Sequence, residues 1–395
     1  MTAIENQHLD LTTIDFAAVT NCGDLPQPMM PPIKQALYKA KPEDFVVNER
    51  LEVDFTDAGE HLWLHIEKSG INTAYLAKLL SEWADIPLRD VGYSGLKDRQ
   101  ALTTQWFSLR LPKKQKPDSD FAPVDIKEHE TVKIIAEHWH NKKLNRGTHN
   151  ANQFVITLRD IEFAKDQTLG DKSSVEQHLQ TISTTGVPNY FGPQRFGFGG
   201  NNIREALNLF AKPLKITSSA KKKNKRKSAV REQNSMELSA ARSLIFNQIL
   251  AARVQDGSWN TGLNGDVFNL NGSGSIFASE HMDETLQARL ASGDIHPTAV
   301  MWGAGNNKVA GEAAELENTV VQQDALLAAL ATGLEQHEVK AQRRALRLPV
   351  EDLSWQWSDE QDEEQTLVLS FTLTTGSFAT SVLASVVEHL QLGSA

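Results

Sequence analysis

The chain of 395 residues contains one cysteine, Cys22. A single thiol cannot close an intramolecular disulfide and cannot supply a cysteine-based zinc site. No apolar run approaches the roughly 20 residues that a membrane-spanning helix needs. The first ten residues also lack the basic segment and apolar core of a signal peptide. We therefore expect a cytoplasmic protein without a membrane anchor.

Lysine and arginine are also outnumbered by aspartate and glutamate, which gives a formal net charge of −10. Such a balance by itself argues against binding of nucleic acid, whose phosphates need a positive footprint. The cations are concentrated, however, at 113–116, at 133–146 and above all at 221–227, where six of seven residues are lysine or arginine. Focused basic surfaces allow an acidic protein to bind RNA.

The hydrophobic pattern predicts alternating strands and helices around a helical middle. Residues 1–32 are expected to form a loosely held arm. Alternation predicts two strands over 43–67, and Thr73 is typical of an N-cap for the helix that follows. The same pattern predicts strands at 106–111, 131–137 and 153–159, and a helix at 174–184.

The second half is predicted to be mostly helical until the chain nears its last strand. Residues 213–235 are polar and basic, so a mobile segment is expected there. Helical periodicity spans 236–254 and 310–334. Alternation returns near 367–371, and a final helix is expected to open at 376–380 and to end near Leu392.

The most informative stretch is the polar run at 94–105, which places the carboxylate of Asp98 between Lys97 and Arg99. Gly92 and Gly95 let the backbone turn tightly just before it. A single acid on a turn flanked by cations can act as a nucleophile or base beside an anionic substrate. The alternative is a surface turn with ordinary ion pairs.

A second dense motif at 188–197 interleaves aromatic residues, glycines and an arginine. This mixture suits flat contact with bases and phosphates, although a buried loop whose aromatic rings simply pack is the alternative. Dinucleotide and phosphate-loop fingerprints are absent from the sequence. His138 and His140 lack carboxylates at zinc spacing, so no metal site is expected.

Four blocks in order, at 39–47, 95–105, 186–197 and 376–381, resemble the tRNA pseudouridine synthase D family, TruD. The similarity runs from about residue 33 to 390. It implies an enzyme that isomerises uridine to pseudouridine in tRNA, at position 13, without a cofactor. It also implies a monomer whose macromolecular partner is tRNA.

The resemblance further implies an α+β fold, with a mixed, largely antiparallel sheet and helices in the catalytic domain. That domain is expected at 33–213 and 353–395, interrupted by an inserted α/β TRUD module at 214–352. Asp98 falls at the family's catalytic aspartate, and Phe45, Asn189 and Phe378 fall where the family contacts the target nucleotide. The supporting residues of the same blocks are Lys39, Lys97, Arg99, Phe191 and Arg195.

The proposed chemistry requires Asp98 to be ionised beside a base that has been flipped out of the RNA. In extended backbone Lys97 and Arg99 point away from Asp98, so we expect them to meet phosphates and expect Lys39 to pair with the acid. The sequence leaves open whether Asp98 attacks C1′, adds to C6 or removes a ribose proton. The rival hypotheses are a non-catalytic RNA-binding protein and a metal-dependent nuclease.

Overall fold

The computed structural model describes residues 10–122, 129–164, 170–212, 226–358 and 365–393, with only the backbone described for 226–234. The basic run at 221–227 therefore lies largely outside the described residues. The chain divides into two compact units. We call Pro31–Ser183, Val350–Ala379 and Val386–Ala395 the sheet unit, and Met1–Met30, Thr184–Pro349 and Thr380–Ser385 the helical unit.

The sheet unit is built on one mixed sheet, which has ten strands within the described residues. Its main path is β14-β15-β7-β2-β5-β3-β6, with β1, β16 and β4 paired beside it. Only the β2–β5 and β1–β16 pairings among these are parallel, which confirms the predicted mixed, largely antiparallel sheet. The bounds are β1 Ile33–Tyr38, β2 Phe45–Arg50, β3 His61–Ser69, β4 Val91–Tyr93, β5 Leu102–Arg110, β6 Thr131–His140, β7 Ala151–Phe163, β14 Glu351–Trp357, β15 Leu367–Thr374 and β16 Val387–Leu392.

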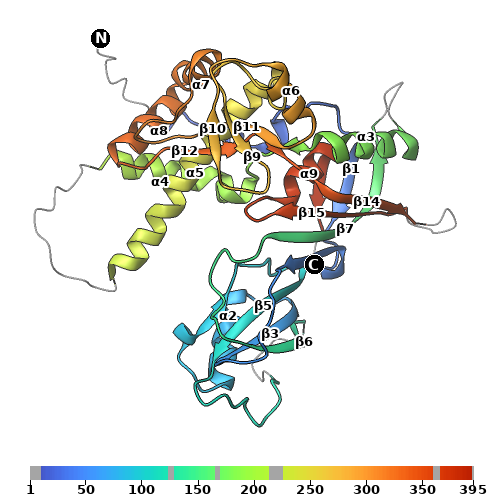
Figure 1. The fold of residues 1–395 in the computed structure, drawn as a ribbon. Helices are drawn as coiled ribbons and strands as arrows, with labels where there is room; N and C mark the ends of the chain where they lie inside the picture. Colours follow the sequence, from blue (N-terminus) through green and yellow to red (C-terminus); the bar gives the residue numbers. More distant parts are fainter. Residues whose placement is uncertain (1–9, 123–128, 165–169, 213–225, 359–364, 394–395) are drawn as a thin grey trace, which may run out of the picture. The chain divides into compact units, whose positions relative to one another are not determined.

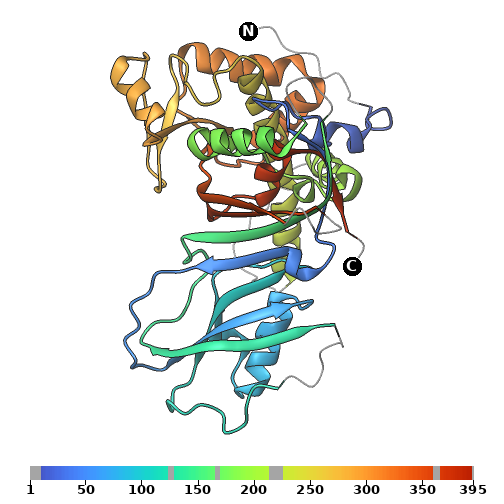
Figure 2. The ribbon, with the colours of Figure 1, turned by 90° about the vertical axis from the view of Figure 1, so that its right-hand side faces the viewer.

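Helix α2 (Thr73–Trp83) covers one face of β3 and β5 in the sheet unit (Figures 1 and 2). Alternate residues of β3, among them Leu62 and Leu64, point toward α2 and bury its apolar face in one core. The predicted N-cap is wrong by one residue, because the side chain of Asn72 accepts the N–H of Ala74. Thr73 is instead the first helical residue and donates its hydroxyl to Gln105. Helix α3 spans Lys172–Thr185.

The helical unit packs its helices around α5, which contacts α4, α7, α8 and β11 (Figure 1). A four-stranded sheet of order β10-β9-β11-β12 and the short pair β13-β8 complete its described strands. The bounds are α1 Phe16–Val19, α4 Asn201–Phe210, α5 Arg226–Gln255, α6 Glu284–Ala291, α7 Gly311–Gln323, α8 Ala325–Gln336, β8 Val187–Pro188, β9 Val267–Leu270, β10 Ile276–Ala278, β11 Ile295–Met301, β12 Gln342–Ala345 and β13 Arg347–Leu348. Helix α9 (Ala379–Val386) contributes Thr380–Ser385 to this unit.

The expectation of a loosely held arm is wrong for the described residues 10–30. Phe16 is buried at 2% exposure, and the guanidinium of Arg204 lies 4.9 Å from its ring. The hydroxyl of Tyr190 donates to the carbonyl of Pro26 at 3.0 Å. The buried Phe16 ring and the hydrogen bond from Tyr190 therefore anchor residues 10–30 within the helical unit.

Three helix predictions needed correction. The helix expected over 310–334 is two helices, because Asp324 has an extended backbone and its side chain caps α8. Residues 226–235 are helical, as the first turns of α5, rather than part of a mobile segment. The last helix ends at Val386, since the following residues form β16 against β1 and tertiary pairing overrides local propensity.

The family's inserted module, 214–352, stays a prediction. The two compact units are defined by contacts between residues, and they place the boundaries at Thr184 and Pro349. These boundaries do not test where the family's module begins and ends.

Candidate active site

Asp98 lies on the loop between β4 and β5, and the main chain around it is held at several points. The N–H of Gly70 donates to the carbonyl of Arg99 at 2.9 Å, and the N–H of Lys97 donates to the hydroxyl of Thr73 at 3.1 Å. The N–H of Gln100 donates to Oδ1 of Asp98 itself at 3.0 Å. The carboxylate is therefore presented on a fixed loop, with 31% of the side chain exposed.

Lys39 contacts the carboxylate of Asp98 through its ammonium group. Lys39 follows β1 and has a φ of 56°, a left-handed conformation that side-chain-bearing residues adopt rarely. Its side chain is 8% exposed, and Nζ lies 4.2 Å from the centre of the Phe45 ring. The structure thus places against Asp98 the lysine that the first sequence block suggested. Such unusual backbone conformations cluster at functional sites.

The surroundings keep Asp98 ionised. Burial alone would raise the pKa of Asp98, whereas the hydrogen bond and the charge of Lys39 lower it. The N–H of Gln100 and the charge of Lys68 act in the same direction, so the pKa lies below the usual value for aspartate. At neutral pH the group is a carboxylate, which can act as a nucleophile or a base.

A second lysine, Lys68, is completely buried beneath the same loop. Its Nζ donates to the carbonyl of Ile71 at 3.0 Å and to the main-chain carbonyl of Asp98 at 3.3 Å. Burial lowers the pKa of Lys68 to about 8, although the negative charge of Asp98 opposes this effect. Lysine is rarely fully buried without partners, so Lys68 belongs to the support of the Asp98 loop.

The expected phosphate-facing role is wrong for Lys97, which is buried in an ion pair with Glu49. Their side chains are 5% and 0% exposed, and Nζ lies 3.0 Å from Oε1. The second carboxylate oxygen of Glu49 accepts the N–H of Trp106 at 2.8 Å. Arg99 is half exposed, but it donates to the carbonyl of Gly70 and lies 3.5 Å from Glu130. Both cations therefore stabilise the loop.

Phe45 and Phe378 also belong to the sheet unit. Phe45 is the first residue of β2 and is buried at 6% exposure, with edge contacts to Tyr38 and Phe154. It also carries Lys39 over its ring. Phe378 is half-buried and lies in the connection from β15 to α9. The structure thus brings Asp98, Lys39 and Phe45 together in one cluster.

Asn189, Phe191 and Arg195 belong to the helical unit and form a second cluster. Asn189 follows β8, and its N–H donates to the carbonyl of Leu346 at 2.8 Å. The N–H and the carbonyl of Phe191 are both bonded to the side chain of Asn247 at 2.9 Å. The guanidinium of Arg195 lies 5.1 Å from the Phe191 ring. The aromatic rings of the second motif are therefore buried and packed, while Pro193 and Gln194 of the same loop are exposed.

Sequence reasoning missed Glu49, Lys68 and Arg344. Glu49 and Lys68 lie in strands whose pattern gives no sign of a charged partner 30 or more positions away. Lys68 is the only lysine in β3, but Glu67 beside it makes the end of that strand look solvated, so the sequence gives little reason to single it out. Arg344 donates to Oδ1 of Asn189 at 2.6 Å, although the two residues are 155 positions apart in the sequence. No local sequence pattern predicts that contact.

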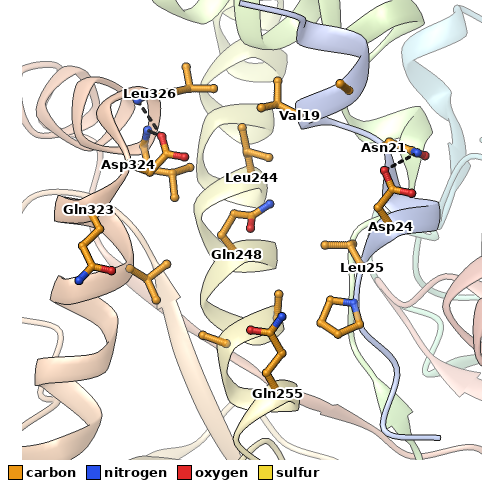
Figure 3. Close-up of a pocket in the computed structure, with 16 residues that line it drawn as sticks. Val19, Asn21, Asp24, Leu25, Leu244, Gln248, Gln255, Gln323, Asp324 and Leu326 are labelled. Atoms are coloured by element: carbon orange, nitrogen blue, oxygen red, sulfur yellow. Dashed lines mark hydrogen bonds between the residues drawn. The ribbon is translucent and has the colours of Figure 1, made fainter. Parts of the chain in front are cut away.

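A cavity of about 510 Å³ lies elsewhere in the helical unit (Figure 3). Leu244 and Gln248 of α5 line it between the N-terminal segment, with Val19 and Leu25, and the α7–α8 junction at Asp324. The side chain of Asp324 is already engaged in capping α8. Asp98, Lys39 and Phe45 do not line this cavity.

Among the described residues, no three histidine, cysteine, aspartate or glutamate side chains converge in a way that could hold a metal ion. His138 stacks on Phe55 with 4.3 Å between ring centres, and His140 meets Trp63 edge to face. The two histidines thus pack against aromatic rings. In the same described part of the chain, no helix is both long enough and apolar enough to cross a bilayer.

The fold and the Asp98 cluster define an α+β protein with a carboxylate held ionised by lysine on a fixed loop. Comparison with known proteins is consistent with this description. The family model for tRNA pseudouridine synthase D (TruD) matches residues 31–208 and 204–386. This chain belongs to the TruD family of tRNA pseudouridine synthases, which are isomerases.

Individual relatives cover almost the whole chain. It is 67% identical to tRNA pseudouridine synthase D of Psychrobacter arcticus, over 95% of this chain and 96% of that protein. It is 41% identical to tRNA pseudouridine synthase D of Xanthomonas campestris, over 88% and 90% of the two chains. A crystal structure of a TruD protein from Methanosarcina mazei shares the fold, with a TM-score of 0.67 and 22% identity over 93% of this chain and 97% of that one.

Proposed function

We propose that this chain converts uridine to pseudouridine at position 13 of tRNA, and that Asp98 acts on the extruded nucleotide. The observation that carries the proposal is the contact between Lys39 and the half-buried carboxylate of Asp98. That contact favours the ionised form of Asp98 at neutral pH, beside an anionic substrate. Family membership supports the substrate class.

The reaction is an isomerisation that needs no oxidant or reductant. The bond between C1′ and N1 breaks, the base turns over, and C5 bonds to C1′. The hydrogen on C5 is lost as a proton and N1 gains one, so atoms and electrons balance. In this proposal the carboxylate of Asp98 attacks C1′, adds to C6 or removes a ribose proton, and it is regenerated in each case.

The remaining site residues would bind and shield the base. A uridine inside folded RNA must be flipped out, and stacking on an aromatic ring is worth about 1–3 kcal/mol per base. In the proposal, Phe45 and Phe378 supply apolar walls that keep water from the detached base. Asn189 both donates and accepts hydrogen bonds, which suits the uracil edge. We place the enzyme in the cytoplasm, acting as a monomer.

Release of tritium from tRNA carrying [5-³H]uridine tests the proposal, because C5 loses its hydrogen. Asp98→Asn should abolish release while tRNA affinity changes less than about threefold, since the change removes one negative charge. Asp118→Asn, on an exposed loop, serves as the matched control. Full activity of Asp98→Asn would overturn the catalytic assignment, and pseudouridine mapped at another position would overturn the assignment to position 13.

A further inference from the structure

Arg344 in β12 makes two contacts with the loop that carries Asn189. One guanidinium nitrogen donates to Oδ1 of Asn189 at 2.6 Å. The guanidinium carbon lies 4.2 Å from the centre of the Phe191 ring and 5.7 Å from that of Phe246. A planar guanidinium stacked on aromatic rings cannot swing freely, so its donor is fixed in space.

The carboxamide of Asn189 is held from both ends. Arginine is only a donor, so the atom that faces Arg344 must be the oxygen. Nδ2 donates to the main-chain carbonyl of Ala345 at 2.9 Å, and a carbonyl is only an acceptor. Both neighbours therefore favour the same orientation of the amide. If the amide were rotated by 180°, Oδ1 would face the carbonyl oxygen of Ala345 and Nδ2 would face the guanidinium of Arg344, and both hydrogen bonds would be lost.

The main chain around this amide is equally constrained. Strand β13 pairs with β8 immediately before Asn189, and the N–H of Asn189 bonds to Leu346. Burial, and then the charge of Arg195, lower the pKa of Arg344 to about 10, so the guanidinium keeps its proton at neutral pH. Asn189 is 6% exposed, and each of its amide heteroatoms makes one side-chain hydrogen bond within the protein, Oδ1 with Arg344 and Nδ2 with Ala345.

We infer that Arg344 is a specificity-determining residue, which fixes Asn189 in the orientation that accepts uracil and rejects cytosine. This inference rests on the proposed function, in which Asn189 meets the base. Uracil has a donor at N3 between two carbonyl acceptors. The locked amide keeps one lone pair of Oδ1 for N3–H and one hydrogen of Nδ2 for a carbonyl.

Cytosine presents the opposite pattern on the edge formed by its N3 and amino group. Its N3 is an acceptor and its amino group is a donor, so pairing with that edge requires the amide to turn over. While Arg344 and Ala345 hold the amide, Oδ1 faces the lone pair of N3 instead. Arg344 thus acts through Asn189 and contacts no reacting atom.

The test compares discrimination in the full-length enzyme. We measure kcat/KM for tRNA with uridine at the target position, and Ki for the same tRNA with cytidine there. Arg344→Met should reduce the preference for uridine by about tenfold, within the range that a two-bond contact to a base contributes. Arg344→Lys keeps the charge and one donor, so it should retain part of the preference.

Arg242→Met is the matched control, because it also removes a half-buried guanidinium near β12. Arg242 donates to the carbonyls of Met301 and Lys340 and to the side chain of Gln342. The preference of Arg242→Met for uridine over cytidine should equal that of the wild type. Circular dichroism checks folding, and if Arg344→Met does not fold, the result for Arg344→Lys decides.

An unchanged preference in a folded Arg344 variant would overturn the inference and leave the proposed function intact. A general loss of activity with an unchanged preference would mean that Arg344 only stabilises the loop, which also overturns it. Absence of turnover in the wild type would overturn the proposed function, and this inference with it.

Discussion

Asp98 is held between two lysines that act on different parts of it. The ammonium of Lys39 contacts the carboxylate, while that of Lys68 donates to the main-chain carbonyl at 3.3 Å. Both lysines lower the pKa of Asp98, and the hydrogen bond of Lys68 also holds the main chain of the loop.

Replacement of Lys39 by methionine should move the acidic limb of the pH–rate profile to higher pH. Lys39 is a main cause of the lowered pKa of Asp98, and without it burial would raise that pKa. A shift of one unit or more in the limb of kcat/KM is expected. Lys34→Met, a change at an exposed lysine of β1, is the control. A limb that stays in place would show that Asp98 is not the titrating group.

The lowered pKa of Asp98 also makes stability depend on pH. Since the unfolded chain binds the proton more tightly than the folded one, ionised Asp98 stabilises the fold above its unfolded pKa of about 4. That contribution is lost as pH falls through the lower, folded pKa. The difference in unfolding free energy between the wild type and Asp98→Asn should therefore shrink on acidification below about pH 4, as measured by urea unfolding. A constant difference would contradict this.

Lys68 should also make stability rise with pH, but in the alkaline range. Its pKa is about 8 in the fold and about 10.4 in an unfolded chain, so the unfolded state binds more protons between these values. Relative to Lys68→Met, the unfolding free energy of the wild type should rise over this window, by up to about 3 kcal/mol. Lys78→Met, on the exposed face of α2, should show no such rise. A flat difference for Lys68→Met would mean that Lys68 keeps an ordinary pKa.

Replacement of Lys97 by methionine should destabilise the protein by about 3–5 kcal/mol, because it leaves Glu49 charged and buried without its partner. The half-exposed Arg99 should tolerate the same change at a cost of about 1 kcal/mol or less. Urea unfolding measures both. The salt dependence of tRNA binding should not change in Lys97→Met, and a flatter slope would restore the phosphate-contact hypothesis.

The N-terminal segment should contribute to stability. Phe16→Ala is expected to cost about 3–5 kcal/mol, as for other buried phenylalanines. Met30→Ala, at a residue with 61% exposure, should change stability by less than about 0.5 kcal/mol. Thermal unfolding of the two variants distinguishes an anchored segment from a loose one, since equal melting temperatures would favour the latter.

The sequence predicted the elements whose pattern is local. Strands such as β3 place Leu62, Leu64 and Ile66 at alternate positions, and the Asp98 loop is marked by glycine and charge, so the sequence predicts both directly. The pairing of Lys39 with Asp98 was also accessible, because an ionised buried acid requires a cation and the extended backbone pointed Lys97 elsewhere.

What could not be predicted depends on partners far away in the chain. Lys97 points away from Asp98 as expected, but its environment is set by Glu49 on another strand. Residues 387–392 have no strong local preference, and pairing with β1 decides that they are a strand. The contact between Arg344 and Asn189 depends on the β13–β8 pairing in the same way.

The pairing of β1 with β16 bears on how the protein is made. β1 has β7 on one side and β16 on the other, and 387–392 leave the ribosome long after 33–38. At about 5–20 residues per second, one edge of β1 waits for its neighbour for tens of seconds. By contrast, Thr184–Pro349 packs mainly on itself and on Met1–Met30, which are all synthesised before β16. We therefore expect Thr184–Pro349 to fold before the sheet is complete, while the open edge of β1 exposes nascent chains to misassembly.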